Sequence, residues 1–248
     1  REEFEVHYQP IVALDSGRVE GFEALARWKD SDGLPIPPNE FIPLAEEIGT
    51  ISDLEHQILR RVCCDIQQWR ELVGRSVPYV SVNLSGKELA NPSFANQVAD
   101  TLRDFEVDPS WLRFEVTESS IVENSSVAVQ ILAALRQLGI RVYIDDFGTG
   151  YSSLSSLHSY PVDTLKIDQS FVSGDATSHD NWEIVRIIIG LANNLGLEVI
   201  AEGIETTEQL DAIRELGCSL GQGFLFSKPV LPTEVERFLG ASEIDVVA

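Results

Sequence analysis

Polar side chains that suit metal and acid–base chemistry recur at one position of the sequence pattern, the C-terminal ends of short apolar runs. Glu23 lies inside the apolar residues 21–25, and Asn83 ends the run 80–83. The other members of this set are Glu115, Asp145, Asp146, Lys166, Glu202 and Gln222. In a parallel barrel the C-terminal strand ends meet on one face, where barrel enzymes keep their active sites. We therefore expect these side chains to converge.

Converging carboxylate and amide oxygens are typical ligands of hard cations such as Mg²⁺ or Mn²⁺. The sequence has four histidines, and their positions lack the spacing of a zinc site. Each acidic residue alone has a simpler interpretation, as a solvated rim residue or a helix cap, and Asn83 with Ser85 could form an ordinary turn. Charged residues inside apolar strands are costly unless they are paired or metal-bound. The repetition of the pattern at one end of one sheet therefore favours a metal site.

The elements that would position this set alternate in type along the chain. Turn-forming residues 14–18 separate the strand-like residues 4–13 from 19–28, and a turn this short joins only antiparallel strands. Further strands are expected at 79–83, 112–116, 141–145, 164–167, 198–201 and near 223–226. Helices are expected at about 40–48, 52–73, 92–105, 124–138, 152–159, 181–195, 206–216 and 232–239, the first of them capped by Asn39 after the loop 35–38. This alternation predicts a parallel sheet covered by helices, closed into a barrel.

The chain length and the net charge narrow the class of protein further. The 248 residues suit one domain spanning 1–248, since a single barrel of this type takes about 250 residues. A formal net charge of −22, from 40 acidic and 18 basic residues, argues against binding to long nucleic acids, which require a basic surface. It does not exclude a small anionic ligand, because bound metal ions can dominate the local field.

The cysteines and the apolar runs indicate the cellular compartment in which the chain is expected. Cys63, Cys64 and Cys218 are odd in number and lack a CxxC spacing, which disfavours a disulfide framework and indicates a reducing, cytoplasmic environment. The apolar runs fall short of the roughly 18 residues that span a membrane, so we do not expect this segment to insert into one. The chain starts at Arg1 and contains no Met, which indicates a piece of a longer protein, either soluble or membrane-anchored.

Longer motifs surround the polar residues. Glu-Ala-Leu at 23–25 sits in Gly-Phe-Glu-Ala-Leu-Ala-Arg-Trp and follows Tyr-Gln-Pro-Ile-Val at 8–12. Further along the chain come Val-Asn-Leu-Ser (82–85), Phe-Glu-Val-Thr-Glu-Ser (114–119), Asp-Asp-Phe-Gly-Thr-Gly-Tyr-Ser-Ser-Leu (145–154), Leu-Lys-Ile-Asp (165–168), Ala-Glu-Gly-Ile-Glu (201–205) and Gln-Gly-Phe (222–224). The sequence resembles the EAL domain family in these motifs and in their order, and the resemblance covers nearly the whole chain. The departures are mild: Ala26 replaces a common Leu, Gln169 a frequent Arg and Phe224 a frequent Tyr.

The resemblance implies an α/β fold, a modified TIM (β/α)8 barrel in which the first strand runs antiparallel, in agreement with the predicted hairpin. It also implies a phosphodiesterase that hydrolyses cyclic di-GMP to linear pGpG with two ions of Mg²⁺ or Mn²⁺. The implied metal ligands are Glu23, Asn83, Glu115 and Asp145 for one ion, Asp145 and Asp146 for the second, and Glu202 as a base or a ligand through water. Lys166 would orient or activate the attacking water. The implied catalytic residues are Glu23, Lys166 and Glu202.

Substrate contacts and partners also follow from the resemblance. The implied substrate-binding residues are Gln9, Leu25, Arg27, Asp168, Glu205 and Gln222. Arg27 would clamp a phosphate, because a guanidinium offers a planar fork of donors. Glu118 would anchor the loop 147–151, whose glycines permit reshaping and which in this family contributes to the dimer contact. The resemblance therefore implies a homodimer, and a covalently linked sensory or GGDEF-type domain in the full protein.

Two other functions remain open at this point. A catalytically silent receptor would bind cyclic di-GMP and signal through a partner domain without turnover. Loss of Glu23, Asp145 or Glu202 would favour that reading, and all three are present. A barrel lyase of the enolase type also groups carboxylates around Mg²⁺, since fold alone does not fix function. It would act on carboxylate substrates and have no affinity for cyclic di-GMP.

Overall fold

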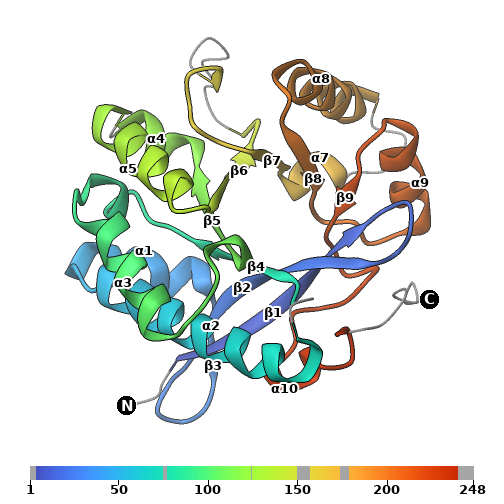
Figure 1. Cartoon of the computed structure of the whole chain (residues 1–248). Coiled ribbons are helices and arrows are strands. Elements are labelled where there is room, and N and C mark those ends of the chain that lie inside the picture. Colours follow the sequence, from blue (N-terminus) through green and yellow to red (C-terminus); the bar gives the residue numbers. More distant parts are fainter. Residues whose placement is uncertain (1–3, 75–76, 124, 150–156, 174–178, 240–248) are drawn as a thin grey trace.

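The strands of the computed structural model form a closed barrel with the helices outside it (Figure 1). The structure describes residues 4–74, 77–123, 125–149, 157–173 and 179–239. Strand β1 (Phe4–Ala13) pairs antiparallel with β2 (Val19–Lys29), which confirms the predicted hairpin and the antiparallel first strand. The following barrel strands run parallel to β2, namely β4 (Tyr79–Asn83), β5 (Leu112–Thr117), β6 (Arg141–Phe147), β7 (Thr164–Ile167), β8 (Glu198–Ala201) and β9 (Leu220–Gly221). Strand β9 then pairs antiparallel with β1 and closes the ring.

Helices fill the connections between these strands. Their bounds are α1 (Pro38–Ile48), α2 (Ile51–Val73), α3 (Phe94–Asp104), α4 (Glu118–Glu123), α5 (Ser125–Gln137), α7 (Gln169–Val172), α8 (His179–Leu195), α9 (Thr207–Glu215) and α10 (Pro232–Val235), with short 3-10 turns at Glu88–Ala90 and Pro109–Trp111. Among these helices, including the 23-residue α2, none combines the length and the apolar character needed to cross a membrane.

The alternation of side chains along each strand separates two environments. On β5, Phe114 and Val116 belong to the large core between the barrel and the helices, whereas Glu115 points the opposite way. A second, small apolar cluster of Ile11, Tyr143 and Ile200 is distinct from that core and has Tyr79 and Leu220 packed against it. By this alternation Glu23, Glu115, Asp145 and Lys166 lie on the same face as the small cluster. The period of two in the sequence therefore aims them into the barrel.

Several sequence-based boundaries differ from the structure. The predicted strand near 223–226 is wrong: these residues form a turn, and the strand lies at Leu220–Gly221. A Cβ on Gly223 would lie 2.0 Å from the carbonyl oxygen of Ile204, so only glycine allows this close crossing of two backbones. The helix predicted at 124–138 is preceded by a separate short helix, α4, at 118–123. The sequence reading also missed the two-residue strand β3 (Pro35–Ile36), which pairs with the end of β2.

The ends of two further helices were also misplaced. Asn39 does not cap α1, because Pro37 is the cap and its successor Pro38 takes the first helical position. The helix predicted at 232–239 ends at Val235 and continues as turns. Of the helix predicted at 152–159, residues 152–156 lie outside the described part of the chain.

A buried polar network ties the first barrel strand to α2. The hydroxyl of Tyr8 donates to Asp65 Oδ2 at 2.6 Å, and Arg61 Nε lies 3.1 Å from Asp65 Oδ1. Tyr8 and Asp65 are both fully buried. Because a buried carboxylate is costly without donors, this contact couples the position of α2 to that of β1.

Removing one donor from this network is expected to destabilise the fold. Tyr8→Phe deletes the hydroxyl and leaves Asp65 with Arg61 alone, so the free energy of unfolding should fall by about 1–3 kcal/mol. Urea denaturation measures this change. Tyr160→Phe, which removes a half-buried tyrosine hydroxyl elsewhere, serves as the control. Equal stability of Tyr8→Phe and the wild type would show that the network does not stabilise the fold.

Candidate active site

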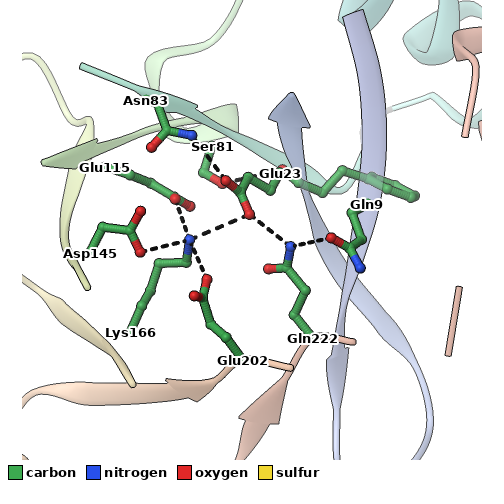
Figure 2. A network of polar contacts seen from close by, with 10 residues as sticks. Gln9, Glu23, Ser81, Asn83, Glu115, Asp145, Lys166, Glu202 and Gln222 are labelled. Carbon is green, nitrogen blue, oxygen red and sulfur yellow. Dashed lines mark hydrogen bonds and ion pairs between the residues drawn. The ribbon is translucent and has the colours of Figure 1, made fainter. Parts of the chain in front are cut away.

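One buried ammonium group joins four carboxylates at the C-terminal ends of the barrel strands (Figure 2). Lys166 of β7 is fully buried, and its Nζ lies 2.6 Å from Glu202 Oε1 and 3.1 Å from Asp145 Oδ1. The same atom lies 3.4 Å from Glu23 Oε2 and also contacts Glu115 Oε2. The four acids come from β2, β5, β6 and the residue after β8. The predicted convergence of these side chains is therefore present in the structure.

A second acidic group overlaps the first. Asp145, Asp146 and Glu202 each offer an oxygen atom, and these atoms lie within 4.8 Å of one another. Strict alternation would send two consecutive residues to opposite faces of β6. The pairing of β6 with β7 shifts its register between Ile144 and Phe147, and Asp146 has φ +53°. This irregularity lets both aspartates take part in one group.

Amide side chains hold Glu23 from two sides. Asn83 Nδ2 donates to Glu23 Oε1 at 2.9 Å, and Gln222 Nε2 donates to Glu23 Oε2 at 2.7 Å. Gln222 Nε2 also lies 2.9 Å from Gln9 Oε1, and Gln9 Nε2 donates to the carbonyl of Ser227 at 3.2 Å. Gln9 stands directly opposite Glu23 in the hairpin register, so β1 contributes to the site through this pair. Figure 2 shows the chain of contacts from Asn83 to Gln9.

The electrostatics of the cluster are dominated by burial and by repulsion among the acids. Burial, together with repulsion from Asp145 and Glu23, raises the pKa of Glu202 to about 8 despite the attraction of Lys166. Burial and then repulsion from Glu23 also raise the pKa of Glu115 well above its usual range. The pKa of Glu23 is lowered, because Lys166 and the amide donors outweigh the effect of burial. One ammonium thus compensates only part of the negative charge.

The donor set of this cluster fits hard divalent cations. Glu115 Oε1 and Gln222 Oε1 are buried and make no hydrogen bond within the described part of the chain. A buried oxygen without a donor is unfavourable unless another positive partner supplies the lost interaction. Carboxylate and amide oxygens at high density are the ligands that Mg²⁺ and Mn²⁺ prefer. The acidic cluster could therefore bind such an ion, and the assignment of individual ligands stays a prediction.

A cavity of about 180 Å³ lies against the acidic cluster. Its walls include four residues that were predicted to bind substrate, namely Gln9, Leu25, Glu205 and Gln222. Four further wall residues were not predicted, namely Gln169, Gly203, Gly223 and Phe224. The two glycines directly follow Glu202 and Gln222, and this adjacency is the sequence signal that could have identified them. Phe224 is 49% exposed, and Lys228 Nζ lies 5.6 Å from the centre of its ring.

Two predicted substrate-binding residues, Arg27 and Asp168, are not among the walls of this cavity. Arg27 follows Glu23 and Leu25 on the same face of β2, and its Nη1 donates to the carbonyl of Ala26 at 2.9 Å. Asp168 caps α7 by accepting a hydrogen bond from the backbone N–H of Ser170 at 3.0 Å. Their roles toward substrate stay predictions.

The predicted loop anchor also stays a prediction. Glu118 is the first residue of α4, directly after β5. Of the loop 147–151 that it was predicted to hold, residues 150 and 151 lie outside the described part of the chain.

Barrel and site together define an α/β barrel protein with an acidic, metal-suited centre at the C-terminal ends of its strands. The chain belongs to the EAL domain family, whose family model matches residues 1–229. It is 41% identical over 244 residues to "Cyclic di-GMP phosphodiesterase NbdA" of Pseudomonas aeruginosa, covering 98% of this chain and 31% of that protein. It is also 41% identical to "Probable cyclic di-GMP phosphodiesterase PdeB" of Escherichia coli K12, covering 92% of this chain and 43% of that protein. The chain thus spans less than half of either relative.

Solved structures resemble the chain over almost its whole length. The structure described as "PaMucR Phosphodiesterase, c-di-GMP complex" has a TM-score of 0.90 and 36% sequence identity, and the match covers 95% of both chains. The FimX EAL domain of Pseudomonas aeruginosa bound to c-di-GMP has a TM-score of 0.82 at 24% identity, covering 98% of this chain and 93% of that one. The similarity to the FimX EAL domain, at 24% identity, supports only the fold.

Proposed function

We propose that this chain is a phosphodiesterase domain that hydrolyses cyclic di-GMP to linear pGpG with two bound divalent ions, Mg²⁺ or Mn²⁺. The observation that carries the proposal is the buried cluster of Glu23, Glu115, Asp145 and Glu202 around Lys166. Relatives of substantial identity bear the names of cyclic di-GMP phosphodiesterases, which supports the choice of substrate.

The two overlapping acidic groups support the assignment of metal ligands that the family resemblance implies. We assign one ion to Glu23, Asn83, Glu115 and Asp145, and the second to Asp145 and Asp146, with Glu202 beside both. When bound, two such ions acidify a water molecule and stabilise charge on the phosphoryl oxygens of an in-line displacement. Lys166 would orient or activate the attacking water, and Glu202 would act beside it as a base or as a ligand through water. Gln222 and Asn83 keep the carboxylate of Glu23 in one orientation through the bonds described above.

The substrate would occupy the cavity beside the cluster. Arg27 would bind a phosphate oxygen of the dinucleotide from the same face of β2 as Glu23. Gln9, Leu25, Asp168, Glu205 and Gln222 keep their predicted substrate roles in this proposal. The exposed ring of Phe224 offers a flat surface on which a guanine base can stack.

The stacking role of Phe224 gives a direct prediction. Phe224→Ala should raise KM for cyclic di-GMP and leave kcat nearly unchanged, because the ring contacts a base remote from the reacting phosphate. Stacking of one base contributes about 1–3 kcal/mol, which corresponds to a roughly 5- to 150-fold increase in KM. Steady-state kinetics measure both constants. Leu231→Ala, at an exposed residue away from the cavity, is the control. An unchanged KM in Phe224→Ala would contradict the stacking role.

The setting of the domain is part of the same proposal. We propose that residues 1–248 act as one cytoplasmic domain, that two copies form a homodimer, and that a sensory or GGDEF-type domain is covalently linked to it in a longer protein. The curated relatives described above are longer than this chain, which supports the last point. The parent protein is either soluble or membrane-anchored.

Product analysis tests the proposed function. Purified protein is incubated with cyclic di-GMP and Mg²⁺ or Mn²⁺, with a parallel reaction in EDTA, and the products are separated by chromatography. We expect linear pGpG in the presence of metal and none in EDTA. Binding without product would favour the silent receptor. If neither binding nor product is detected, the assignment of the substrate is contradicted.

A further inference from the structure

A carboxylate of α2, outside the site described so far, contacts the segment that follows β4. Glu55 Oε1 accepts a hydrogen bond from the backbone N–H of Ser85 at 2.6 Å, and Glu55 Oε2 accepts one from the Ser85 hydroxyl at 3.0 Å. Both oxygens of one side chain thus hold a single residue. Such a two-point contact fixes the direction in which the chain leaves the strand, which a single bond would not do.

The residue held in this way lies two positions after Asn83, the last residue of β4. Asn83 pairs in register with Glu115 of β5, and the N–H of Leu84 donates to the carbonyl of Glu115 at 2.8 Å. The backbone around Asn83 is therefore held on one side by β5 and on its C-terminal side by Glu55 through Ser85. Asn83 is a solvent-exposed residue whose Nδ2 donates to Glu23 Oε1 at 2.9 Å, so polar contacts rather than core packing fix its position.

The cost of keeping a carboxylate at this position supports a functional reason for it. Burial, followed by repulsion from Glu88 and Glu46, raises the pKa of Glu55 to about 7, although the two bonds from Ser85 act in the opposite direction. Glu55 lines a small cavity together with the apolar side chains of Leu59 and Phe94. An apolar residue at this position would avoid the cost of burying a charge.

We propose that Glu55 is a positioning residue for the metal site: by holding Ser85 it fixes the backbone that presents Asn83 to the ion shared with Glu23 and Glu115. The inference rests on the proposed function insofar as Asn83 is a metal ligand. Glu55 touches neither the substrate nor the ion, and it acts only through the segment 83–85. Partners of this kind orient a ligand, and their loss typically weakens metal affinity by about 10- to 100-fold.

The test measures Mn²⁺ affinity in the absence of substrate, by electron paramagnetic resonance of free Mn²⁺ during titration of the protein. Glu55→Leu should weaken binding of the ion held by Asn83 by about tenfold. Glu55→Gln should restore affinity to near the wild-type value, because its carbonyl can accept from the Ser85 N–H and its amide can donate to the Ser85 hydroxyl. Glu88→Leu is the matched control: Glu88 is a nearby buried carboxylate whose Oε2 accepts from Asn91 at 2.9 Å.

The outcomes separate this inference from the proposed function. The positioning role is supported if Mn²⁺ binding is weaker in Glu55→Leu, is restored in Glu55→Gln and is unchanged in Glu88→Leu. This holds even if the wild type turns over no cyclic di-GMP. Unchanged Mn²⁺ affinity in Glu55→Leu overturns the role even if the wild type is an active enzyme. If Glu55→Leu fails to fold, Ser85→Ala, which removes only the hydroxyl contact, takes its place: weaker Mn²⁺ binding in Ser85→Ala supports the role, and wild-type affinity in Ser85→Ala overturns it. A wild type that binds no Mn²⁺ overturns both proposals.

Discussion

Glu23→Gln should abolish turnover of cyclic di-GMP while the protein stays folded. Glutamine has the shape of glutamate, and its one carbonyl oxygen can accept a hydrogen bond from Asn83 or from Gln222, but it removes a negative charge from the predicted metal site. Loss of a ligand to a catalytic ion should raise the barrier by at least about 4 kcal/mol, which is a loss in kcat of about 1000-fold. Turnover at saturating substrate and Mn²⁺ measures this effect, and circular dichroism verifies the fold.

A second glutamate-to-glutamine substitution on the same strand provides the matched control for Glu23→Gln. Glu20 lies at the beginning of β2, where it forms an ion pair with Arg18 and takes no part in the cluster. Glu20→Gln removes the same charge from the chain and should keep nearly full activity. If Glu23→Gln retained more than a tenth of wild-type turnover, the role of Glu23 as a metal ligand would be wrong.

Lys166→Met should destabilise the protein strongly when metal is removed. The variant leaves Glu23, Glu115, Asp145 and Glu202 without their shared ammonium. Removing one partner from a buried ionic group costs about 3–5 kcal/mol, because the opposite charges stay buried and uncompensated. Urea unfolding in EDTA measures the loss. Mn²⁺ should restore part of it, since ions bound only by the folded state add stability and supply the missing positive charge.

The control for this prediction is an exposed lysine. Lys87 lies at the surface, where its Nζ donates to the carbonyl of Gly49 at 3.1 Å. Lys87→Met should change the free energy of unfolding by less than about 1 kcal/mol in EDTA and in Mn²⁺ alike. Equal stability of Lys166→Met and the wild type in EDTA would mean that Lys166 does not compensate the cluster. A larger loss in Mn²⁺ than in EDTA would contradict the predicted restoration.

The sequence predicted the convergence of the charged side chains better than it predicted the boundaries of the fold. Glu115, Lys166 and the other charged residues stand at the C-terminal ends of predicted parallel strands, so their common face followed from the direction of the strands. The apolar residues Phe224 and Leu225 misplaced the last strand, because they look like strand residues. The strand ends at Gly221, and the crossing of Gly223 over Ile204 turns the chain away from the sheet.

Contacts between distant residues escaped prediction for a different reason. The bond between Gln9 and Gln222 joins residues 213 positions apart, and it exists only because β9 closes the barrel next to β1. The contact of Glu55 with Ser85 likewise depends on how α2 packs beside β4. Local sequence patterns carry no information on such pairs, since the pairs are set by tertiary packing. The placement of Asp146 beside Asp145 similarly depends on a local irregularity of β6.

The most direct test of the central claim is a crystal structure with Mn²⁺ and cyclic di-GMP, with anomalous scattering recorded at the manganese edge. We predict two manganese peaks: the first surrounded by Glu23, Asn83, Glu115 and Asp145, the second by Asp145 and Asp146, with a phosphate of the dinucleotide against both. Absence of manganese from these residues, or binding of the dinucleotide away from them, would contradict the account.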